Sequence, residues 1–392
     1  MVKKLEKKIR IVEAAIDVFF EKSYDEVSIS QICKNAKVSN GLFYTHYKNK
    51  LEIYHEILEK SVGRLEGVIK NIKGETTSER LESFIKENYI SSKKEYKLLK
   101  IFREGQYRFI EYETKVRKAY LKALGQVFKR KITNLEYIYI VSGMRYININ
   151  FKLKNIEKDS KFISKLILNG IFDKTSEVAI DSFDEKDLYS RTLFKSKNLK
   201  HKLLEKGEIL FGSKGVYDTK VSDLVKNVGG GIGGFYYYFK TKENFLREVV
   251  VNNQKILYFF LNDNVNKKRP ALEQYIFCLY LFLEYYKNST YKYQIIREVE
   301  FIDSSLLQKF NDEMINFYSN LISQMKYDDY IISHIGHDDY LRKLICYFLM
   351  GLPHYMGIEF FFTKKINNEF LFLKKMNIFL TEGVLNLDCQ IR

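Results

Sequence analysis

Helix-breaking residues are scarce in this sequence, which contains 2 prolines and 20 glycines among 392 residues. Proline removes a helical hydrogen bond, and glycine costs a helix about 1 kcal/mol relative to alanine. Their scarcity, together with abundant Leu, Ile, Glu and Lys, predicts an all-α protein. Hydrophobic residues make up 46% of the chain, which excludes wholesale disorder, and the length predicts two or more domains.

Cysteine is also scarce, and its four positions show no paired spacing: Cys33, Cys278, Cys346 and Cys389. This usage predicts reduced, mainly buried thiols in a cytoplasmic protein. The basic start MVKKLEKKIR leads into an apolar stretch that Glu13 and Asp17 interrupt, so no signal peptide is predicted. The strongest apolar run, residues 344–362, contains a proline, a histidine and a glutamate and barely reaches spanning length. We expect a buried core helix there and no membrane partner.

Positive charge is in excess, with a formal net charge of +16. Residues 1–196 hold 39 Lys and Arg against 27 Asp and Glu, so most of the excess lies in the first half. A basic protein suits nucleic acid or an anionic membrane, and a lysine-rich surface without either partner is equally compatible. The charge by itself does not choose among these classes.

An internal repeat is the most informative feature of the chain. A shift of 192 positions aligns residues 9–58 with 201–250 without a gap. Identical residues recur in the two copies at these pairs: Phe19 and Phe211, Lys22 and Lys214, Ser30 and Ser222, Asn35 and Asn227, Gly41 and Gly233, Phe43 and Phe235, Tyr44 and Tyr236, and Lys50 and Lys242. We interpret this register as a duplication.

Each copy predicts the same order of helices. In the first copy, apolar residues recur at helical spacing from Ile9 to Phe19, and a break follows at Ser23. Ser28 is suited to cap a second, short helix, and Ser39 to cap a third. The two short helices flank a tight turn around residues 36–38. This arrangement is typical of a helix-turn-helix, whose second helix enters the major groove of DNA.

The ends of the two halves also echo each other. The pair of helices predicted over 137–153 and 162–172 ends with Gly170-Ile171-Phe172, and the pair predicted over 341–362 and 370–387 ends with Gly383-Val384-Leu385. The duplication therefore covers whole domains. The predicted division is a head at 1–60, a helical body at 61–175, a polar linker at 176–194, a second head at 195–252 and a second body at 253–392.

Residues 36–50 read AKVSNGLFYTHYKNK, which resembles the DNA-binding head of the tetracycline-repressor (TetR) family, with its pattern A-G-V-S-x-G-x-[LF]-Y-x-[HY]-[FY]-x-[SN]-K. The second copy, VGGGIGGFYYYFKTKE at 228–243, matches more weakly. The paired helices that end each half resemble the family's dimerisation helices. The resemblance implies two tandem units, each a three-helix head on a helical ligand-binding and dimerisation body. It also implies a regulator, normally a homodimeric repressor, that reads an operator.

By this resemblance, the first copy would contact DNA through Ser28, Ser30, Ser39, Asn40, Leu42, Tyr44, Thr45, His46, Lys48 and Lys50. The second copy would use Lys220, Ser222, Tyr236, Tyr237, Tyr238, Lys240 and Lys242. Hydroxyls and lysines suit phosphates, whereas Asn40 and His46 suit base edges. Phe43 and Tyr47 are expected in the core of the head.

Both copies depart from the family pattern. Lys37 replaces the usual turn glycine, which costs on the order of 1 kcal/mol if the backbone there has a positive φ. The second copy has Gly231 for the capping serine, Ile232 for Asn40 and Gly234 for Leu42. Its base-reading groups are missing, so it either reads sequence in another way or only grips phosphates.

Two rival sites are weaker. The glycines of residues 229–234 satisfy the dinucleotide fingerprint G-x-G-x-x-G, but that fingerprint follows a strand, and the preceding VSDLVKNV is typical of a helix. His334, His337, Asp338 and Asp339 have a spacing that a metal site uses, although a solvated loop is the better interpretation. We expect no cofactor, no metal and no enzymatic activity.

Aromatic residues are dense in both bodies, where most are expected in cores and some to line a cavity for a small apolar or aromatic effector. The candidate ligand-binding residues are Tyr89, Phe102, Tyr107, Tyr280 and Tyr285. The paired helices of the two halves predict an intramolecular pseudo-dimer on an asymmetric DNA operator, with a homodimer of tandem chains as the alternative. An architectural or partner-binding protein with a decayed second head is the rival function.

Overall fold

The computed structural model describes residues 2–174, 178–180, 183, 198–302, 304–324, 327, 331–333 and 338–385. Within these residues the protein is α-helical, and its one β-type contact is an isolated bridge between Phe172 and Tyr327. The predicted all-α class is confirmed. The helices pack into two units: Met1–Ile132 with Lys154–Ser164, and Thr133–Leu153 with Lys165–Arg392. The predicted linker at 176–194 lies almost wholly outside the described residues.

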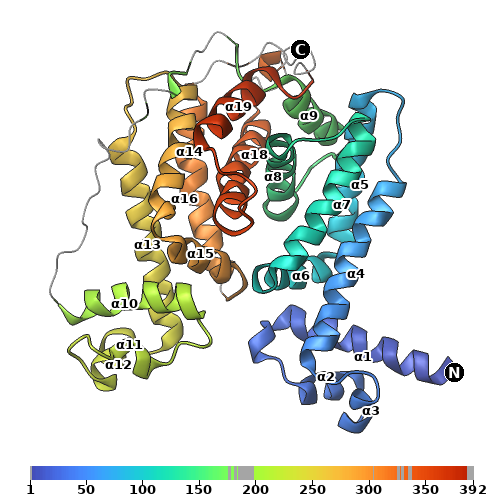
Figure 1. Ribbon diagram of the computed structural model, residues 1–392, viewed down its shortest axis with the longest axis vertical. Coiled ribbons are helices and arrows are strands. Elements are labelled where there is room, and N and C mark those ends of the chain that lie inside the picture. Colours follow the sequence, from blue (N-terminus) through green and yellow to red (C-terminus); the bar gives the residue numbers. More distant parts are fainter. Residues whose placement is uncertain are drawn as a thin grey trace. The chain divides into compact units, whose positions relative to one another are not determined.

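Unit 1 contains the first head and the helices that follow it (Figure 1). The head comprises α1 (Val2–Glu21), the 3-10 turn Tyr24–Glu26, α2 (Ile29–Ala36), α3 (Asn40–Tyr44) and the start of α4 (Lys50–Lys70). The body comprises α5 (Thr77–Lys94), α6 (Tyr96–Arg108), α7 (Ile110–Phe128) and the beginning of α9 (Ile156–Asn169). Helix α4 runs out of the head and packs against α5, α6 and α7, so it joins head and body.

Unit 2 contains the second head, on α10 (Leu199–Lys214), α11 (Val221–Val225), α12 (Ile232–Phe239) and the start of α13 (Lys242–Asn264). Its body comprises α14 (Ala271–Lys287), α15 (Thr290–Ile302), α16 (Ser304–Ile322), α18 (Asp339–Gly357), the π-helical turn Ile358–Phe362 and α19 (Glu369–Glu382). Helix α8 (Asn134–Asn150), from the first half of the sequence, packs along α18 and belongs to this unit. Unit 2 therefore does not coincide with the second half of the sequence, because it includes a helix from the first half.

Helices α8 and α18 approach each other through glycines. A Cβ at Gly143 would lie 2.3 Å from the Phe348 ring, and one at Gly351 would lie 2.5 Å from the Ser142 carbonyl oxygen. Among the described residues, the stretch Asp339–Phe362 is long and apolar enough to cross a membrane, but 83% of its most apolar window is buried inside the protein. It is the core helix that the sequence predicts.

The ends of α9 and α19 contact each other reciprocally. The Ile171 N–H donates to the Leu380 carbonyl (2.7 Å), and the Val384 N–H donates to the Ile167 carbonyl (3.1 Å). Gly170 and Gly383 both have positive φ, and each lies against the backbone of the other segment. Counted from the two glycines, Ile171 corresponds to Val384, and Ile167 corresponds to Leu380. Each half therefore donates to the other from the same position and accepts at the same position. Reciprocity of this kind characterises an interface between two equivalent surfaces.

Candidate nucleic-acid interface

The first recognition helix, α3, is held by two aromatic anchors. Phe43 is fully buried and Tyr47 is 3% exposed, and their ring centroids lie 5.5 Å apart. The Ser39 hydroxyl accepts the Leu42 N–H (3.2 Å), which caps the helix as predicted. Because the inner side is fixed in this way, the outer side faces solvent, and Tyr44 is 57% exposed.

Helix α2 supports this outer surface. Ser28 and Gln31 form a capping box, in which the Ser28 N–H donates to Gln31 Oε1 (2.7 Å) and the Ser28 hydroxyl accepts the Gln31 N–H (3.2 Å). The predicted contact residues that are solvent-exposed in this head are Ser28, Ser30, Ser39, Asn40, Tyr44, Thr45 and Lys48. Leu42 and His46 are half-buried, and His46 follows the end of α3.

Lys50 has a different position from the one expected. Its Nζ donates to the carbonyl oxygens of Tyr24 (2.6 Å) and Val27 (2.8 Å) and lies 4.2 Å from the centre of the Tyr24 ring. Burial lowers the pKa of this ammonium group. Lys50 therefore holds the turn that precedes α2, and its contact with a phosphate stays a prediction. Lys242 in the second head is placed alike, with Nζ 3.5 Å from the Tyr217 carbonyl oxygen and a pKa lowered by burial.

The turn before the recognition helix is left-handed in both heads. Lys37 has a φ of 54°, and Gly229, at the same place in the repeat, has a φ of 79°. Lys37 therefore meets the condition under which a side chain at this turn is strained. Glycine adopts this conformation without strain, whereas lysine pays on the order of 1 kcal/mol.

The second recognition helix, α12, keeps the anchors and changes the outer surface. Phe235 and Phe239 are buried against Phe245, as Phe43 and Tyr47 are buried in the first head. The exposed outer residues are apolar or aromatic: Ile232 (51%), Tyr236 (47%), Tyr237 (80%) and Tyr238 (38%). Lys220, Ser222 and Lys240 are also exposed. Gly231 stands at the N-cap position just before α12 and provides no side-chain cap.

The dinucleotide site receives no geometric support, whereas the metal candidate can be described only at its two aspartates. The glycine run at 229–234 lies between α11 and α12, so a helix precedes it where the dinucleotide fingerprint requires a strand. Asp338 caps α18 by accepting the Tyr340 N–H (2.9 Å). His334 and His337 lie outside the described residues.

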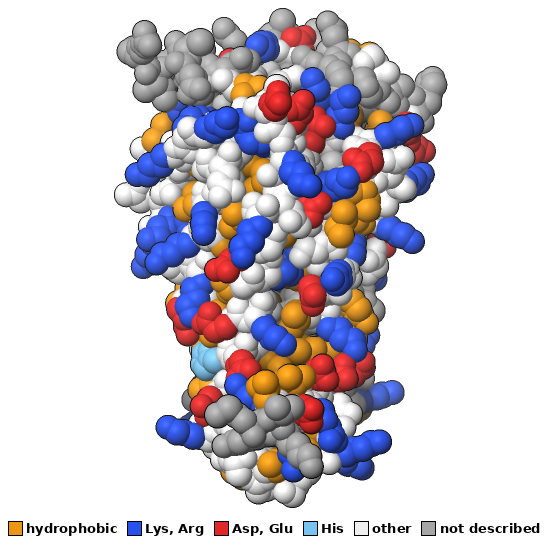
Figure 2. All heavy atoms as spheres, turned by 90° about the vertical axis from the view of Figure 1, so that its right-hand side faces the viewer, with side chains coloured by type: hydrophobic (Ala, Val, Ile, Leu, Met, Phe, Trp, Pro, Cys, Tyr) orange, Lys and Arg blue, Asp and Glu red, His pale blue; other side chains and the backbone are white. Residues whose placement is uncertain are grey.

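Basic side chains are widely distributed on unit 1. Figure 2 shows lysine and arginine side chains interleaved with acidic ones over the face it presents, rather than gathered in one place. On that face (Figure 2) the positive charge is therefore spread out and interrupted by acidic groups. Such a distribution favours general attraction to a polyanion, and specificity must come from individual side chains.

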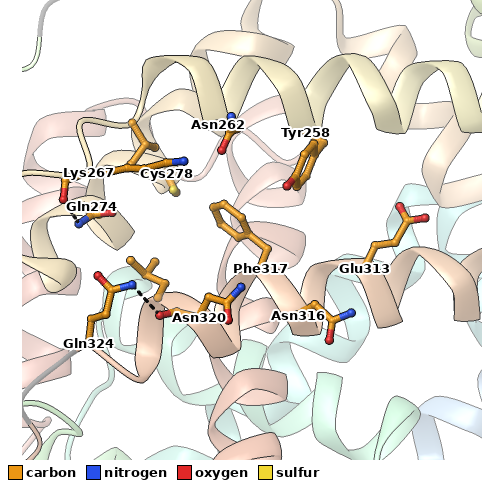
Figure 3. A pocket seen from close by; sticks show the side chains of 12 residues that line it. Tyr258, Asn262, Lys267, Gln274, Cys278, Glu313, Asn316, Phe317, Asn320 and Gln324 are labelled. Carbon is orange, nitrogen blue, oxygen red and sulfur yellow. Dashed lines mark hydrogen bonds between the residues drawn. The ribbon is translucent and has the colours of Figure 1, made fainter.

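Unit 2 contains a cavity of about 340 Å³ among α13, α14 and α16. Figure 3 shows Tyr258 and Asn262 on one helix facing Phe317 and Asn320 on another. A smaller, more apolar hollow adjoins it, and Cys278 lines both. The larger volume is within the range of small-molecule sites, and side-chain amides, a lysine and a glutamate supply its polar groups.

The predicted ligand-binding residues do not line these two cavities. Tyr89, Phe102 and Tyr280 are buried in packed cores, and Tyr107 is half-buried. The Tyr285 hydroxyl donates to Asn253 Oδ1 (3.3 Å). Their role in ligand binding stays a prediction, because an aromatic residue serves core and cavity equally well.

Known proteins resemble the chain in the same two places. The family model "Bacterial regulatory proteins, tetR family" matches residues 11–57 and 203–249. The fatty acid metabolism regulator protein of Bacillus subtilis (strain 168) is 31% identical over 91 residues, which cover 23% of this chain and 47% of that protein. The uncharacterized HTH-type transcriptional regulator YerO of the same organism is 22% identical over 205 residues, covering 47% of this chain and 71% of that protein.

Among solved structures, a TetR-family transcriptional regulator from Syntrophomonas wolfei has a TM-score of 0.38 at 20% identity, covering 46% of this chain and 92% of that one. The chain spans about half the length of the Bacillus fatty acid metabolism regulator. The repeated head motif, its helix-turn-helix geometry and the two family matches agree. Each of the two helix-turn-helix heads therefore matches the tetR family of bacterial regulatory proteins, and the two matching segments lie in tandem in one chain.

Proposed function

We propose that this DNA-binding regulator is a cytoplasmic repressor that reads one operator with two unequal heads. The observation that carries the proposal is the contrast between the recognition helices. The first exposes Asn40, Tyr44 and Thr45, which can donate and accept hydrogen bonds at base edges and phosphates. The second exposes Ile232 and three tyrosines. The first head accordingly supplies most of the specificity.

The two halves of one chain form the pair that would otherwise need two molecules. The reciprocal hydrogen bonds of Ile171 to Leu380 and of Val384 to Ile167 support this intramolecular pseudo-dimer. Tethering favours it further, because the partner surface is present at an effective concentration of about millimolar. The operator then has two different half-sites about one helical turn apart, ~34–36 Å.

A small effector bound in unit 2 releases the DNA. The cavity of about 340 Å³ supports this part of the proposal. Helix α13 contributes Tyr258 to the cavity and Phe245 to the core of the second head, so a ligand that moves α13 also moves that head. The ligand must bind the DNA-free form more tightly to act in this way.

Selection of bound fragments from random DNA with the full chain tests the proposal. We expect an asymmetric site bound by one chain of 46.7 kDa, as measured by light scattering and titration. A species of about 93 kDa, twice that mass, on a palindrome would contradict the pseudo-dimer and favour a homodimer of tandem chains. Failure to enrich any sequence would favour an architectural protein instead.

A further inference from the structure

The outer face of α12 is apolar where the first head is polar. In the register of the repeat, Ile232 occupies the position of Asn40, and Tyr237 that of Thr45. Ile232 is the first residue of α12 and is 51% exposed, and Tyr236 lies one turn further along the helix at 47% exposure. Because they are four residues apart, Ile232 and Tyr236 lie on the same face of the helix, and both are exposed there.

The fold of the head does not use this surface. Phe235 and Phe239 fix the inner side of α12, and Gly234 lies near Leu199. At Gly231 and Gly233, by contrast, an added Cβ would meet nothing within 4 Å. These two glycines leave bare backbone beside Ile232, so the start of the helix can approach another surface closely.

The surroundings of Ile232 indicate which surface that is. Lys220 and Lys226 flank α11, and Lys240 follows α12, and all three are exposed. Exposed apolar residues and exposed lysines on the helices of one head suit a polyanion that also displays apolar groups. The major groove of DNA does so, because each thymine presents a C5 methyl group there beside the phosphate backbone.

We infer that the second head reads its half-site through thymine methyl groups, with Ile232 as the residue that determines specificity. Asparagine recognises adenine by a pair of hydrogen bonds, whereas an aliphatic side chain contacts the methyl group of thymine. Ile232 stands in the second head where Asn40 stands in the first. The two heads therefore prefer different bases at this position, while the docking geometry of the head stays the same. This inference rests on the proposed function, since it requires the second head to lie on DNA.

Deoxyuridine tests the inference directly, because it keeps every hydrogen-bonding group of thymine and lacks only the methyl. We would take the operator selected by the full chain, locate both half-sites by hydroxyl-radical footprinting, and replace the thymines of the weaker half. Affinity should fall about fourfold for each methyl group that is contacted, as expected for one buried methyl. The Ile232→Asn variant should bind the thymine operator more weakly and lose its sensitivity to the replacement.

Ile209→Asn is the matched control, because Ile209 is 48% exposed and lies on α10, outside the recognition helix. It should leave both affinities unchanged, and circular dichroism should show equal helicity in all variants. If the wild-type protein binds thymine and deoxyuridine operators equally, methyl readout is overturned while a two-part footprint upholds the proposed function. A footprint confined to the first half-site overturns the second head's place on DNA, and the inference with it.

Discussion

Phe43 and Tyr47 in the first head, and Phe235 and Phe239 in the second, occupy the same buried places behind their recognition helices. On the outer side the two heads share Tyr44 and Tyr236, Ser30 and Ser222, and Lys48 and Lys240, whereas the positions of Asn40 and Thr45 differ. Buried positions are constrained by close packing, so a substitution there is felt by several neighbours at once. Exposed positions are constrained only by what they bind. The comparison indicates that both heads were kept as folded domains while their binding surfaces diverged.

One pair of buried positions shows how the cores changed together. The first head has Ala15 and Ile53, both fully buried, and the repeat places Gly207 and Phe245 at the same positions. A Cβ at Gly207 would lie 2.4 Å from the Phe245 ring. The smaller residue on α10 therefore makes room for the larger one on α13, and the volume is approximately conserved.

The largest expected effect separates the two recognition surfaces. Asn40→Ala with Tyr44→Ala should reduce operator affinity at least about thirtyfold, since each lost contact costs about 1–3 kcal/mol. The matched double variant, Ile232→Ala with Tyr236→Ala, should reduce it less than about tenfold, because it removes apolar contacts worth less each. Fluorescence anisotropy with the selected operator measures both. Equal losses in the two variants would show that the heads contribute alike.

A smaller effect tests whether the cores diverged as coupled pairs. Gly207→Ala should lower the free energy of unfolding by about 1–3 kcal/mol, because the added methyl overlaps the Phe245 ring. Adding Phe245→Ile reproduces the first head's pair and should recover part of the loss, with a coupling energy of about 0.5–3 kcal/mol. Denaturant unfolding followed by circular dichroism measures the cycle. Strictly additive effects would mean that the two positions do not compensate each other.

Local features of the heads could be predicted from the sequence because their causes are local. The capping roles of Ser28 and Ser39 depend on a hydroxyl and on the two or three residues that follow it. The left-handed turn at Lys37 follows from the glycine that the family pattern has there. The repeat extends only the left-handed turn to the second head, at Gly229, because neither α11 nor α12 has a side-chain cap. Helix α11 also ends at Val225, three positions earlier than α2 does in the register.

Features that depend on tertiary packing could not be predicted. The direction of the Lys50 side chain is set by carbonyl groups about 25 residues away, at Tyr24 and Val27. The cavity in unit 2 could not be located from aromatic content, because the chain has 30 tyrosines and 30 phenylalanines and most of them serve as core. Amide side chains such as Asn262 and Gln274 contribute much of its lining, and single amides give no pattern in a sequence.

The smallest effect tests the turn that precedes each recognition helix. Lys37→Gly should raise the free energy of unfolding by about 0.5–1 kcal/mol, since relief of left-handed strain, about 1–2 kcal/mol, exceeds the extra entropy that glycine loses on folding. Gly229→Ala should lower it by a similar amount. A Cβ there meets nothing within 4 Å, so only the backbone is affected.

Lys37→Ala is the control for this pair, because it removes the lysine charge and keeps a side chain at a φ of 54°. It should give no stabilisation, since the strained backbone persists. Thermal unfolding at low and high salt distinguishes the causes, because salt screens charge and leaves backbone strain unchanged. If Lys37→Ala stabilises the first head as much as Lys37→Gly does, the difference in stability between the two turns comes from charge repulsion and not from backbone conformation. The two heads would then differ at this position only in electrostatics.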